Sequence, residues 1–218
     1  MEADFWLERW QRGEIGFHLP RTHPKLLRYW SDVAGSAEKD AAVLVPLCGK
    51  TLDMRWLADQ GHAVCGVELS QQALDEFVGE SELALSKTGA GYVGAGWQLH
   101  SGDWFEFAAD QPFSLFYDRA ALIALPASMR KRYVSHLLDQ LADQAAGLLI
   151  TLEYSQSEMT GPPFSVQEDE VRQLFSGYAT VTELHRADIL EHEPRFRERG
   201  LSQLQEVVWR IELAAPVA

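Results

Sequence analysis

Apolar and polar residues follow one another along this chain in segments that predict strands and helices in alternation. The segment "AAVLVPL" (Ala41 to Leu47) is apolar throughout, which is typical of a short strand buried on both faces of a sheet. The next segment, "TLDMRWLADQG" (Thr51 to Gly61), carries apolar residues at helical spacing and ends on a glycine, a common helix stop. A second strand-like segment, "HAVCGVELS" (His62 to Ser70), ends on a serine that can cap a further helix. This order predicts two parallel strands, each followed by a helix.

The same alternation continues through the middle of the chain and changes only toward its end. In chain order, the segments are a helix at 71–85, strands at 97–105 and 113–125, a helix at 128–144, a strand at 147–155, a helix at 166–175, and strands at 178–187 and 204–213. We therefore predict a doubly wound α/β sheet with helices on both faces and an antiparallel strand pair near the C-terminus.

The composition is ordinary for a globular protein, with 46% hydrophobic and 23% charged residues among 218. We predict a single domain over 1–218, with a tryptophan-rich N-terminal segment (1–40) and a Rossmann-like core (41–218). No apolar run approaches the roughly 20 residues that span a bilayer, and the acidic N-terminus is unlike a signal peptide. Cys48 and Cys65 lie in apolar segments, as buried thiols in a reducing compartment do, so a cytoplasmic location is expected.

Charge and histidine spacing exclude two classes of partner. The formal net charge is −13, and no stripe of Lys and Arg offsets it, so nucleic acid is not an expected partner. The pairs His18 with His23 and His185 with His192 lack the spacing of a zinc site, so no metal is expected.

Two short motifs resemble nucleotide-binding loops without meeting their requirements. In "CGKTLD", a Walker-type loop would need a glycine where Leu44 stands, inside the predicted strand, so the resemblance is accidental. The segment "GAGYVG" (Gly89 to Gly94) follows a helix and leads into a strand, the reverse of the dinucleotide motif, and is interpreted as a flexible connection.

A better candidate is the turn after the first strand taken together with the end of the second. Gly49 lies in that turn, and Glu68 follows 19 residues later. A carboxylate about 20 residues after the turn meets ribose hydroxyls in Rossmann-type sites, so a nucleoside is expected here. One glycine is too few for a pyrophosphate turn, which favours S-adenosylmethionine. The alternative is an ordinary turn followed by a solvated strand end.

Several longer segments, in the same order, resemble the thiopurine S-methyltransferase family. They are "FWLERWQRGEIGFH", "PLCGKTLDMRWLADQGHAVCGVELS", "YDRAAL" and "TGPPFSV", and the match runs from near residue 4 to near residue 213. The resemblance implies a soluble, monomeric enzyme with a seven-stranded, mostly parallel sheet and an N-terminal helical cover. It would transfer a methyl group from S-adenosylmethionine to an aromatic or heterocyclic thiol such as 6-mercaptopurine, giving S-adenosylhomocysteine.

The same resemblance implies roles for individual residues at the ligand site. The methionine part of the cofactor would lie against Leu47 and Gly49, its ribose against Glu68, and its adenine against Asp103 and Trp104. Trp6, Trp10 and Phe17 would form the N-terminal cover. Arg119 and Arg195 would face the substrate. Arg119 would also lie near the cofactor, and Phe17 near the substrate.

Physical chemistry agrees with these roles. Trp6 and Trp10 are four residues apart on one helical face, so they either pack in a core or cover a pocket, where indole rings attract a sulfonium. Aromatic thiols ionise readily, so Arg119 could stabilise the substrate anion while Asp118 orients its guanidinium; the alternative is a surface ion pair. Methyl transfer to a thiolate needs alignment and a dry site more than acid–base groups.

Three other functions are compatible with these residues. The same site could methylate selenium or tellurium compounds in detoxification and resistance. The fold could instead carry an NAD-dependent oxidoreductase, although the glycine pattern is misplaced for one. A non-catalytic nucleoside sensor would keep the pocket and lose turnover.

Overall fold

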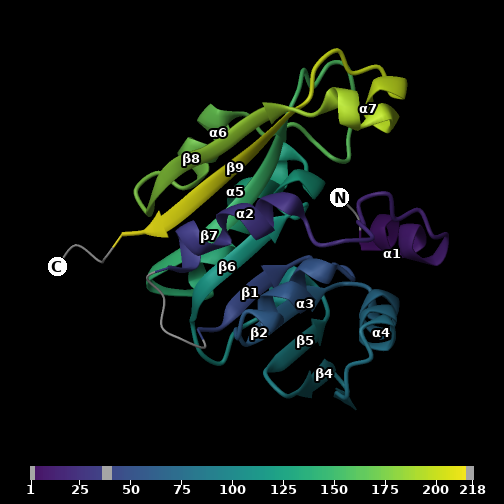
Figure 1. Cartoon of the computed structure of the whole chain (residues 1–218), viewed down its shortest axis with the longest axis vertical. Coiled ribbons are helices and arrows are strands. Elements are labelled where there is room, and N and C mark those ends of the chain that lie inside the picture. The colour runs from purple at the N-terminus through teal and green to yellow at the C-terminus, as the bar shows by residue number, and fades with distance from the viewer. Residues whose placement is uncertain (1–2, 36–40, 215–218) are drawn as a thin grey trace.

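One continuous sheet forms the centre of the protein. The computed structural model describes residues 3–35 and 41–214. The strands are β1 (Val43–Pro46), β2 (Val64–Glu68), β3 (Ser86–Thr88), β4 (Gly91–Gly94), β5 (Trp97–Ser101), β6 (Phe113–Arg119), β7 (Leu141–Glu153), β8 (Ala179–Asp188) and β9 (Gln205–Leu213). They lie in the order β3-β4-β5-β2-β1-β6-β7-β9-β8, as Figure 1 shows.

The centre of the sheet is parallel and its C-terminal edge is antiparallel. Strands β5, β2, β1, β6 and β7 pair in parallel, and β9 pairs antiparallel with both β7 and β8. β1 and β2 are buried along their whole length, because helices cover both of their faces. The predicted doubly wound sheet and its antiparallel pair near the C-terminus are confirmed.

The prediction of seven strands was too low, because a hairpin extends the sheet beyond β5. β3 pairs with β4, and β4 pairs with β5, both antiparallel. The interpretation of Gly89 to Gly94 as a flexible connection was therefore wrong. Gly91 allows the close approach of β4 to β5, because a Cβ at this position would lie 1.9 Å from the Leu99 carbonyl oxygen. Its φ of +131° is also one that other residues rarely adopt.

Seven α-helices are present in the described residues. They are α1 (Ala3–Gln11), α2 (Pro24–Ala34), α3 (Leu52–Asp59), α4 (Gln71–Glu80), α5 (Ala127–Asp139), α6 (Glu168–Leu174) and α7 (Pro194–Glu198). One core packs α2, α3 and α4 against one face of the sheet, and a second core packs α5 and α6 against the other. In Figure 1, α1 and α7 lie beyond one end of the strands, near each other along the same edge of the molecule.

The helix predicted at 128–144 ends earlier than its apolar spacing suggests. α5 stops at Asp139, and Leu141 is the first residue of β7, where it pairs with Phe113. Leu137 and Leu141 both face the core, so helical periodicity alone does not separate the end of a helix from the start of a buried strand. The predicted boundary of the N-terminal segment at residue 40 lies outside the described residues.

None of the helices in the described part of the chain has the length and apolar character needed to span a bilayer. Cys48 and Cys65 are free and buried. Burial raises the pKa of the Cys65 thiol to about 12 and that of Cys48 well above its ordinary value. Both side chains therefore stay protonated at neutral pH and act as small core residues.

Candidate active site

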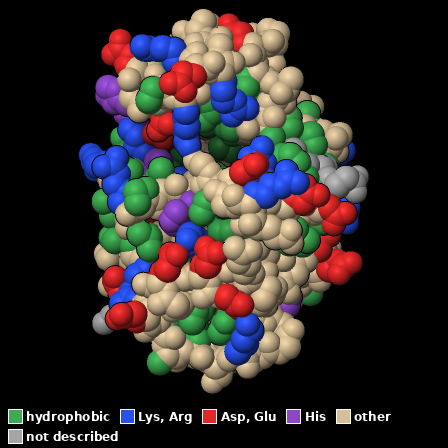
Figure 2. Space-filling view, turned by 90° about the vertical axis from the view of Figure 1, so that its right-hand side faces the viewer, with side chains coloured by type: hydrophobic (Ala, Val, Ile, Leu, Met, Phe, Trp, Pro, Cys, Tyr) green, Lys and Arg blue, Asp and Glu red, His purple; other side chains and the backbone are tan. Residues whose placement is uncertain are grey.

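A pocket with a volume of about 380 Å³ opens where the parallel strands end, on the side that carries α1 and α7. Figure 2 shows this face hollowed in its upper half, with hydrophobic side chains inside the hollow and Lys and Arg side chains around it. The charged or titratable side chains of the lining are Arg9, His23, Glu68, Asp103, Arg119, Glu193, Arg195, Arg199 and Glu206. A mainly apolar pocket with a few charged groups is typical of a small-molecule site, in which the charged groups orient the ligand.

Glu68 lies at the end of β2 and ties the turn after β1 to the turn after β2. Its two oxygens accept hydrogen bonds from the N–H groups of Gly49 and Ser70, each at 2.8 Å. Burial raises the pKa of Glu68, and the hydrogen bonds from Ser70, Gly49 and Leu69 oppose that rise. Each carboxylate oxygen can accept more than one hydrogen bond, so both retain capacity for a ligand.

The turn after β1 needs two residues in the left-handed region. Leu47 has φ +48° and lines the pocket, while Gly49 has φ +54°. A Cβ added at Gly49 would lie 3.2 Å from the indole of Trp10. The structure therefore places Gly49 behind Trp10 and not on the pocket wall.

Lys50, the basic residue of the GKT triplet, holds this turn against α4. Its Nζ lies 2.9 Å from Glu76 Oε2 and 2.7 Å from Glu80 Oε1. The side chain is mostly buried and engaged, so it is not available to a phosphate. This geometry agrees with the interpretation of the triplet as an accidental match.

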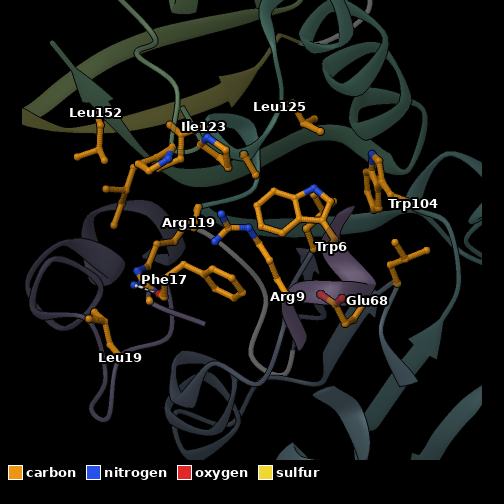
Figure 3. A pocket seen from close by; sticks show the side chains of 18 of the residues that line it. Trp6, Arg9, Phe17, Leu19, Glu68, Trp104, Arg119, Ile123, Leu125 and Leu152 are labelled. Carbon is orange, nitrogen blue, oxygen red and sulfur yellow. Dashed lines mark hydrogen bonds between the residues drawn. The ribbon is translucent and has the colours of Figure 1, made fainter. Parts of the chain in front are cut away.

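Three aromatic residues from the N-terminal segment cover the pocket. The ring of Phe17 packs edge-on against Trp6 (5.8 Å between centroids) and Trp10 (5.7 Å). Trp10 is buried, and its carbonyl accepts a hydrogen bond from Gln72 at the start of α4. Figure 3 shows Trp6 and Phe17 directed into the pocket from this cover. The aromatic side chains thus pack on one another and line the pocket at the same time.

Arg119 lies at the end of β6 and joins this cover to the sheet. Its Nη2 donates to the Phe17 carbonyl oxygen at 3.1 Å, and its Nη1 lies 3.8 Å from Asp53 Oδ2. Asp53 is almost completely buried and also accepts hydrogen bonds from the His23 N–H (2.7 Å) and the Tyr117 hydroxyl (2.9 Å). Asp53 is therefore the carboxylate that faces Arg119.

The prediction that Asp118 orients Arg119 was wrong. Neighbouring residues of a strand point to opposite faces of the sheet, so Asp118 faces α5 while Arg119 faces the pocket. The Asp118 carboxylate accepts hydrogen bonds from the Tyr133 hydroxyl (2.7 Å) and the Leu122 N–H (3.2 Å). Its role is to connect the end of β6 with α5 and the turn that follows the strand.

The environment of Asp118 predicts a pH dependence of stability. Burial raises the pKa of Asp118 from 3.8 to about 6, against the hydrogen bonds from Tyr133, Leu122 and Ala121. The folded protein therefore holds this proton more tightly than the unfolded chain, and the resulting stability is complete below about pH 4 and lost as pH rises through about 6. Relative to Asp118→Asn, the wild-type free energy of unfolding should fall by about 3 kcal/mol over that interval. Urea unfolding across this pH range measures the difference, and parallel profiles for the two proteins would contradict the assignment.

A second buried polar cluster lies beside the first. His23 Nδ1 accepts a hydrogen bond from the Lys25 N–H at the start of α2, and its Nε2 lies 3.3 Å from Glu206 Oε2. Burial acts to raise the pKa of Glu206, but the hydrogen bond and charge of His23, with the charges of Lys25 and Arg119, hold it below its ordinary value. Both ring nitrogens of His23 are thus engaged, and Glu206 stays ionised at neutral pH.

The two residues predicted for the adenine end differ in exposure. Asp103 is exposed and accepts a hydrogen bond from the Phe105 N–H at 2.9 Å, where it caps a short 3-10 turn, η1 (Trp104–Glu106). Trp104 is buried and stacks on Phe107. Its indole Nε1 has no hydrogen-bond partner among the described residues.

Arg195 lies at the rim of the pocket, on α7. Its Nε lies 3.0 Å from Glu193 Oε2, and its Nη1 donates to the Gly16 carbonyl oxygen. Arg195 therefore links α7 to the N-terminal segment across the pocket.

Most of the predicted site residues come together in this one pocket. Those that line it are Trp6, Trp10, Phe17, Leu47, Glu68, Asp103, Trp104, Arg119 and Arg195. Six charged or titratable groups in or beside it were not predicted: Arg9, His23, Asp53, Glu193, Arg199 and Glu206. Asp53 has the pattern of an ordinary acid in the first turn of a helix. Glu206 directly precedes the apolar run Val207 to Trp209 of a buried strand, and that position was the one available signal.

Solved structures with a similar fold come from methyltransferases. One is the Burkholderia thailandensis 1,6-didemethyltoxoflavin-N1-methyltransferase with bound 1,6-didemethyltoxoflavin and S-adenosylhomocysteine (TM-score 0.66, 14% identity, covering 97% of this chain and 87% of that chain). Another is the N-methyltransferase NodS from Bradyrhizobium japonicum in complex with S-adenosylhomocysteine (TM-score 0.62, 11% identity, covering 87% of this chain and 85% of that chain). The fold is therefore that of the S-adenosylmethionine-dependent methyltransferases.

Sequence comparison assigns the family within this class. The family model described as thiopurine S-methyltransferase (TPMT) matches residues 1–214. Relatives named thiopurine S-methyltransferase include one from Bordetella petrii, 48% identical, and one from Xanthomonas axonopodis pv. citri, 46% identical, each covering 97% of this chain and 99% of the relative. The chain belongs to the thiopurine S-methyltransferase family. The predictions of a methyltransferase and of S-adenosylmethionine as its methyl donor are confirmed by this membership.

Proposed function

We propose that the protein methylates the sulfur of aromatic and heterocyclic thiols, with thiopurines such as 6-mercaptopurine as the model substrates. One observation carries the proposal: a carboxylate suited to ribose and a guanidinium suited to an anion line the same apolar pocket. These are Glu68 at the end of β2 and Arg119 at the end of β6. The names of the relatives agree with this substrate class.

The residues at one end of the pocket fit S-adenosylmethionine. Glu68 would accept hydrogen bonds from the ribose hydroxyls, since its oxygens are held in place by backbone N–H groups and have lone pairs to spare. Leu47 would lie against the methionine part, and Trp104 with Asp103 would border the adenine. When bound, the cofactor supplies an electrophilic methyl group on a sulfonium sulfur.

The residues at the other end fit an anionic thiol in a dry environment. Ile123, Leu125 and Leu152 form an apolar wall, and Trp6 with Phe17 covers the opening (Figure 3). Water excluded by these side chains cannot solvate the thiolate, which strengthens its interaction with the guanidinium of Arg119. The thiol is expected to arrive as its anion, because aromatic thiols ionise readily. His23 is not free to act as a base, since both of its ring nitrogens are engaged.

The first experiment is methyl transfer from labelled S-adenosylmethionine to 6-mercaptopurine, with a reaction lacking thiol as the blank. Methylated thiol in the complete reaction alone would support the proposal. Tight S-adenosylmethionine binding without product would reject thiopurines and direct the assay to selenium and tellurium compounds. Binding without turnover of any acceptor would favour a nucleoside sensor, and NADH binding in place of S-adenosylmethionine would favour an oxidoreductase.

Arg119→Lys is expected to lower kcat/KM for the thiol about tenfold or more, because lysine keeps the charge but loses the planar pair of donors. The variant should unfold at nearly the wild-type urea concentration, since lysine can still donate to the Phe17 carbonyl oxygen. Steady-state kinetics with 6-mercaptopurine at saturating cofactor measure the effect. An unchanged kcat/KM would remove Arg119 from the mechanism.

Three further features remain part of the proposal. We expect a monomer, a cytoplasmic location in keeping with two free buried cysteines, and no dependence on metal or nucleic acid. Sedimentation of the purified protein and activity in the presence of a chelator address the first and third of these.

A further inference from the structure

Four arginines line the pocket, and three of them hold its walls together. Arg119 donates to the Phe17 carbonyl oxygen, Arg195 to that of Gly16, and both Nη atoms of Arg199 lie 3.3 Å from that of Pro162. Arg119 and Arg195 also face carboxylates, Asp53 and Glu193. The fourth arginine, Arg9 on α1, differs from the others.

Arg9 has no hydrogen bond or ion pair through its guanidinium among the described residues. Its Nε is buried and without a hydrogen-bond partner. The guanidinium carbon lies 4.8 Å from the centroid of the Phe5 ring, a cation–π contact. Figure 3 shows Arg9 reaching into the pocket, on the side where Trp6, Phe17 and Arg119 also point inward.

Within the described part of the chain, no acidic side chain of the pocket forms an ion pair with Arg9. Glu68 is held by backbone N–H groups, Glu193 pairs with Arg195, and Glu206 pairs with His23. Asp103 is exposed and caps the η1 turn. Arg9 thus places a cation and a buried, unpaired donor in a pocket whose acids are already engaged, and such a donor is satisfied when a ligand brings an acceptor.

We infer that Arg9 binds a carboxylate of the ligand, as a second anion-binding residue beside Arg119. A guanidinium and a carboxylate match as a planar pair with two parallel hydrogen bonds, and such a pair is strong where water is excluded. Because Arg9 belongs to α1, this contact also closes the aromatic cover over the bound ligand. The inference rests on the proposed function and names the residue that would contact the carboxylate of the ligand.

Two molecules in the reaction can carry this carboxylate: the methionine part of the cofactor, or a thiol substrate with an acidic substituent. Each has a counterpart that lacks the carboxylate. Decarboxylated S-adenosylmethionine keeps the sulfonium and the amine, and methyl 4-mercaptobenzoate keeps the thiol of 4-mercaptobenzoate. Comparing each pair on the same variants isolates the carboxylate from the remaining contacts.

The test uses Arg9→Gln, with Arg9→Lys as the conservative variant and Arg12→Gln as the matched control. Arg12 directly follows the same helix, but its partner is Glu8 and it does not line the pocket. Calorimetry gives Kd for S-adenosylmethionine and its decarboxylated form, and kinetics give KM for the two thiols. We expect Arg9→Gln to raise either the Kd for S-adenosylmethionine or the KM for 4-mercaptobenzoate about tenfold, while the same constant for the counterpart without the carboxylate changes less than about twofold. Arg9→Lys should recover part of the loss, and Arg12→Gln should behave as wild type.

The outcomes distinguish the cofactor from the thiol substrate as the source of the carboxylate. They also distinguish failure of the role inferred for Arg9 from failure of the proposed function. Selective loss of S-adenosylmethionine affinity assigns Arg9 to the cofactor, and selective loss for 4-mercaptobenzoate assigns it to the substrate. Equal effects on the partners with and without the carboxylate, or no effect on either, would overturn the inference. Failure of the wild type to methylate any thiol would reject the proposed function and leave the calorimetric result standing.

Discussion

Asp53→Ala is expected to lower the free energy of unfolding by about 3–5 kcal/mol, the usual consequence of removing one partner from a buried charged network. Asp53 is 1% exposed, and its carboxylate accepts hydrogen bonds from the His23 N–H and the Tyr117 hydroxyl. It also forms an ion pair with the Arg119 guanidinium. Alanine would leave the His23 N–H and the Tyr117 hydroxyl without this acceptor in the core, remove the charge that faces Arg119, and leave a cavity where the carboxylate was. Urea unfolding followed by tryptophan fluorescence measures the change.

Asp53→Asn separates the packing of this residue from its charge. Asparagine keeps the volume and an oxygen for the His23 N–H, so less than half of the alanine loss is expected. The guanidinium of Arg119 would keep its bond to the Phe17 carbonyl but lose the negative charge that faces it. We therefore expect kcat/KM for the thiol to fall about tenfold. Wild-type kinetics in Asp53→Asn would show that Asp53 supports the fold without positioning Arg119.

Glu68→Ala should raise the Kd for S-adenosylmethionine tenfold or more, on the order of 1.4 kcal/mol. The variant loses the acceptor for the ribose hydroxyls, and it also releases the N–H groups of Gly49 and Ser70 that the carboxylate holds. The turn against which the cofactor lies would then be less well ordered before binding. Isothermal titration with S-adenosylmethionine, with no thiol present, measures this affinity.

The control for Glu68→Ala is Asp59→Ala, which removes an exposed carboxylate at the end of α3 that pairs with Arg55. Asp59 does not line the pocket, so its loss should leave Kd unchanged. A wild-type affinity in Glu68→Ala would reject the ribose assignment. An equal loss of affinity in Glu68→Ala and Asp59→Ala would reject it as well, because it would show that the change in net charge is the cause.

Most of the fold was predictable because its signals are local. Continuous apolar runs at β1 and β2 indicate burial on both faces, and Ser70 caps α4 through a hydrogen bond to the Ala73 N–H. The hairpin of β3 and β4 was missed because its glycines are also typical of a loop. The pairing of β4 with β3 and β5 shows that the segment is held in a sheet.

The candidate site was predictable only in part. Glu68 could be placed from its distance along the chain to the turn at Gly49, since parallel strands end at one edge of the sheet. Asp118 was misassigned because adjacency in sequence suggested an ion pair with Arg119, whereas strand geometry turns the two side chains to opposite faces.

By itself, the sequence determined the alternation of strands and helices, the edge of the sheet where the ligand site forms, and the family. These follow from periodicity, caps and motifs that a chain carries wherever it folds. Which charges meet was settled only by the tertiary structure: Asp53 lies near Arg119, His23 near Glu206, and Lys50 pairs with α4, while Arg9 Nε has no hydrogen-bond partner among the described residues. Such pairings depend on how elements distant in sequence pack together, and a local sequence pattern does not show which of these elements come into contact.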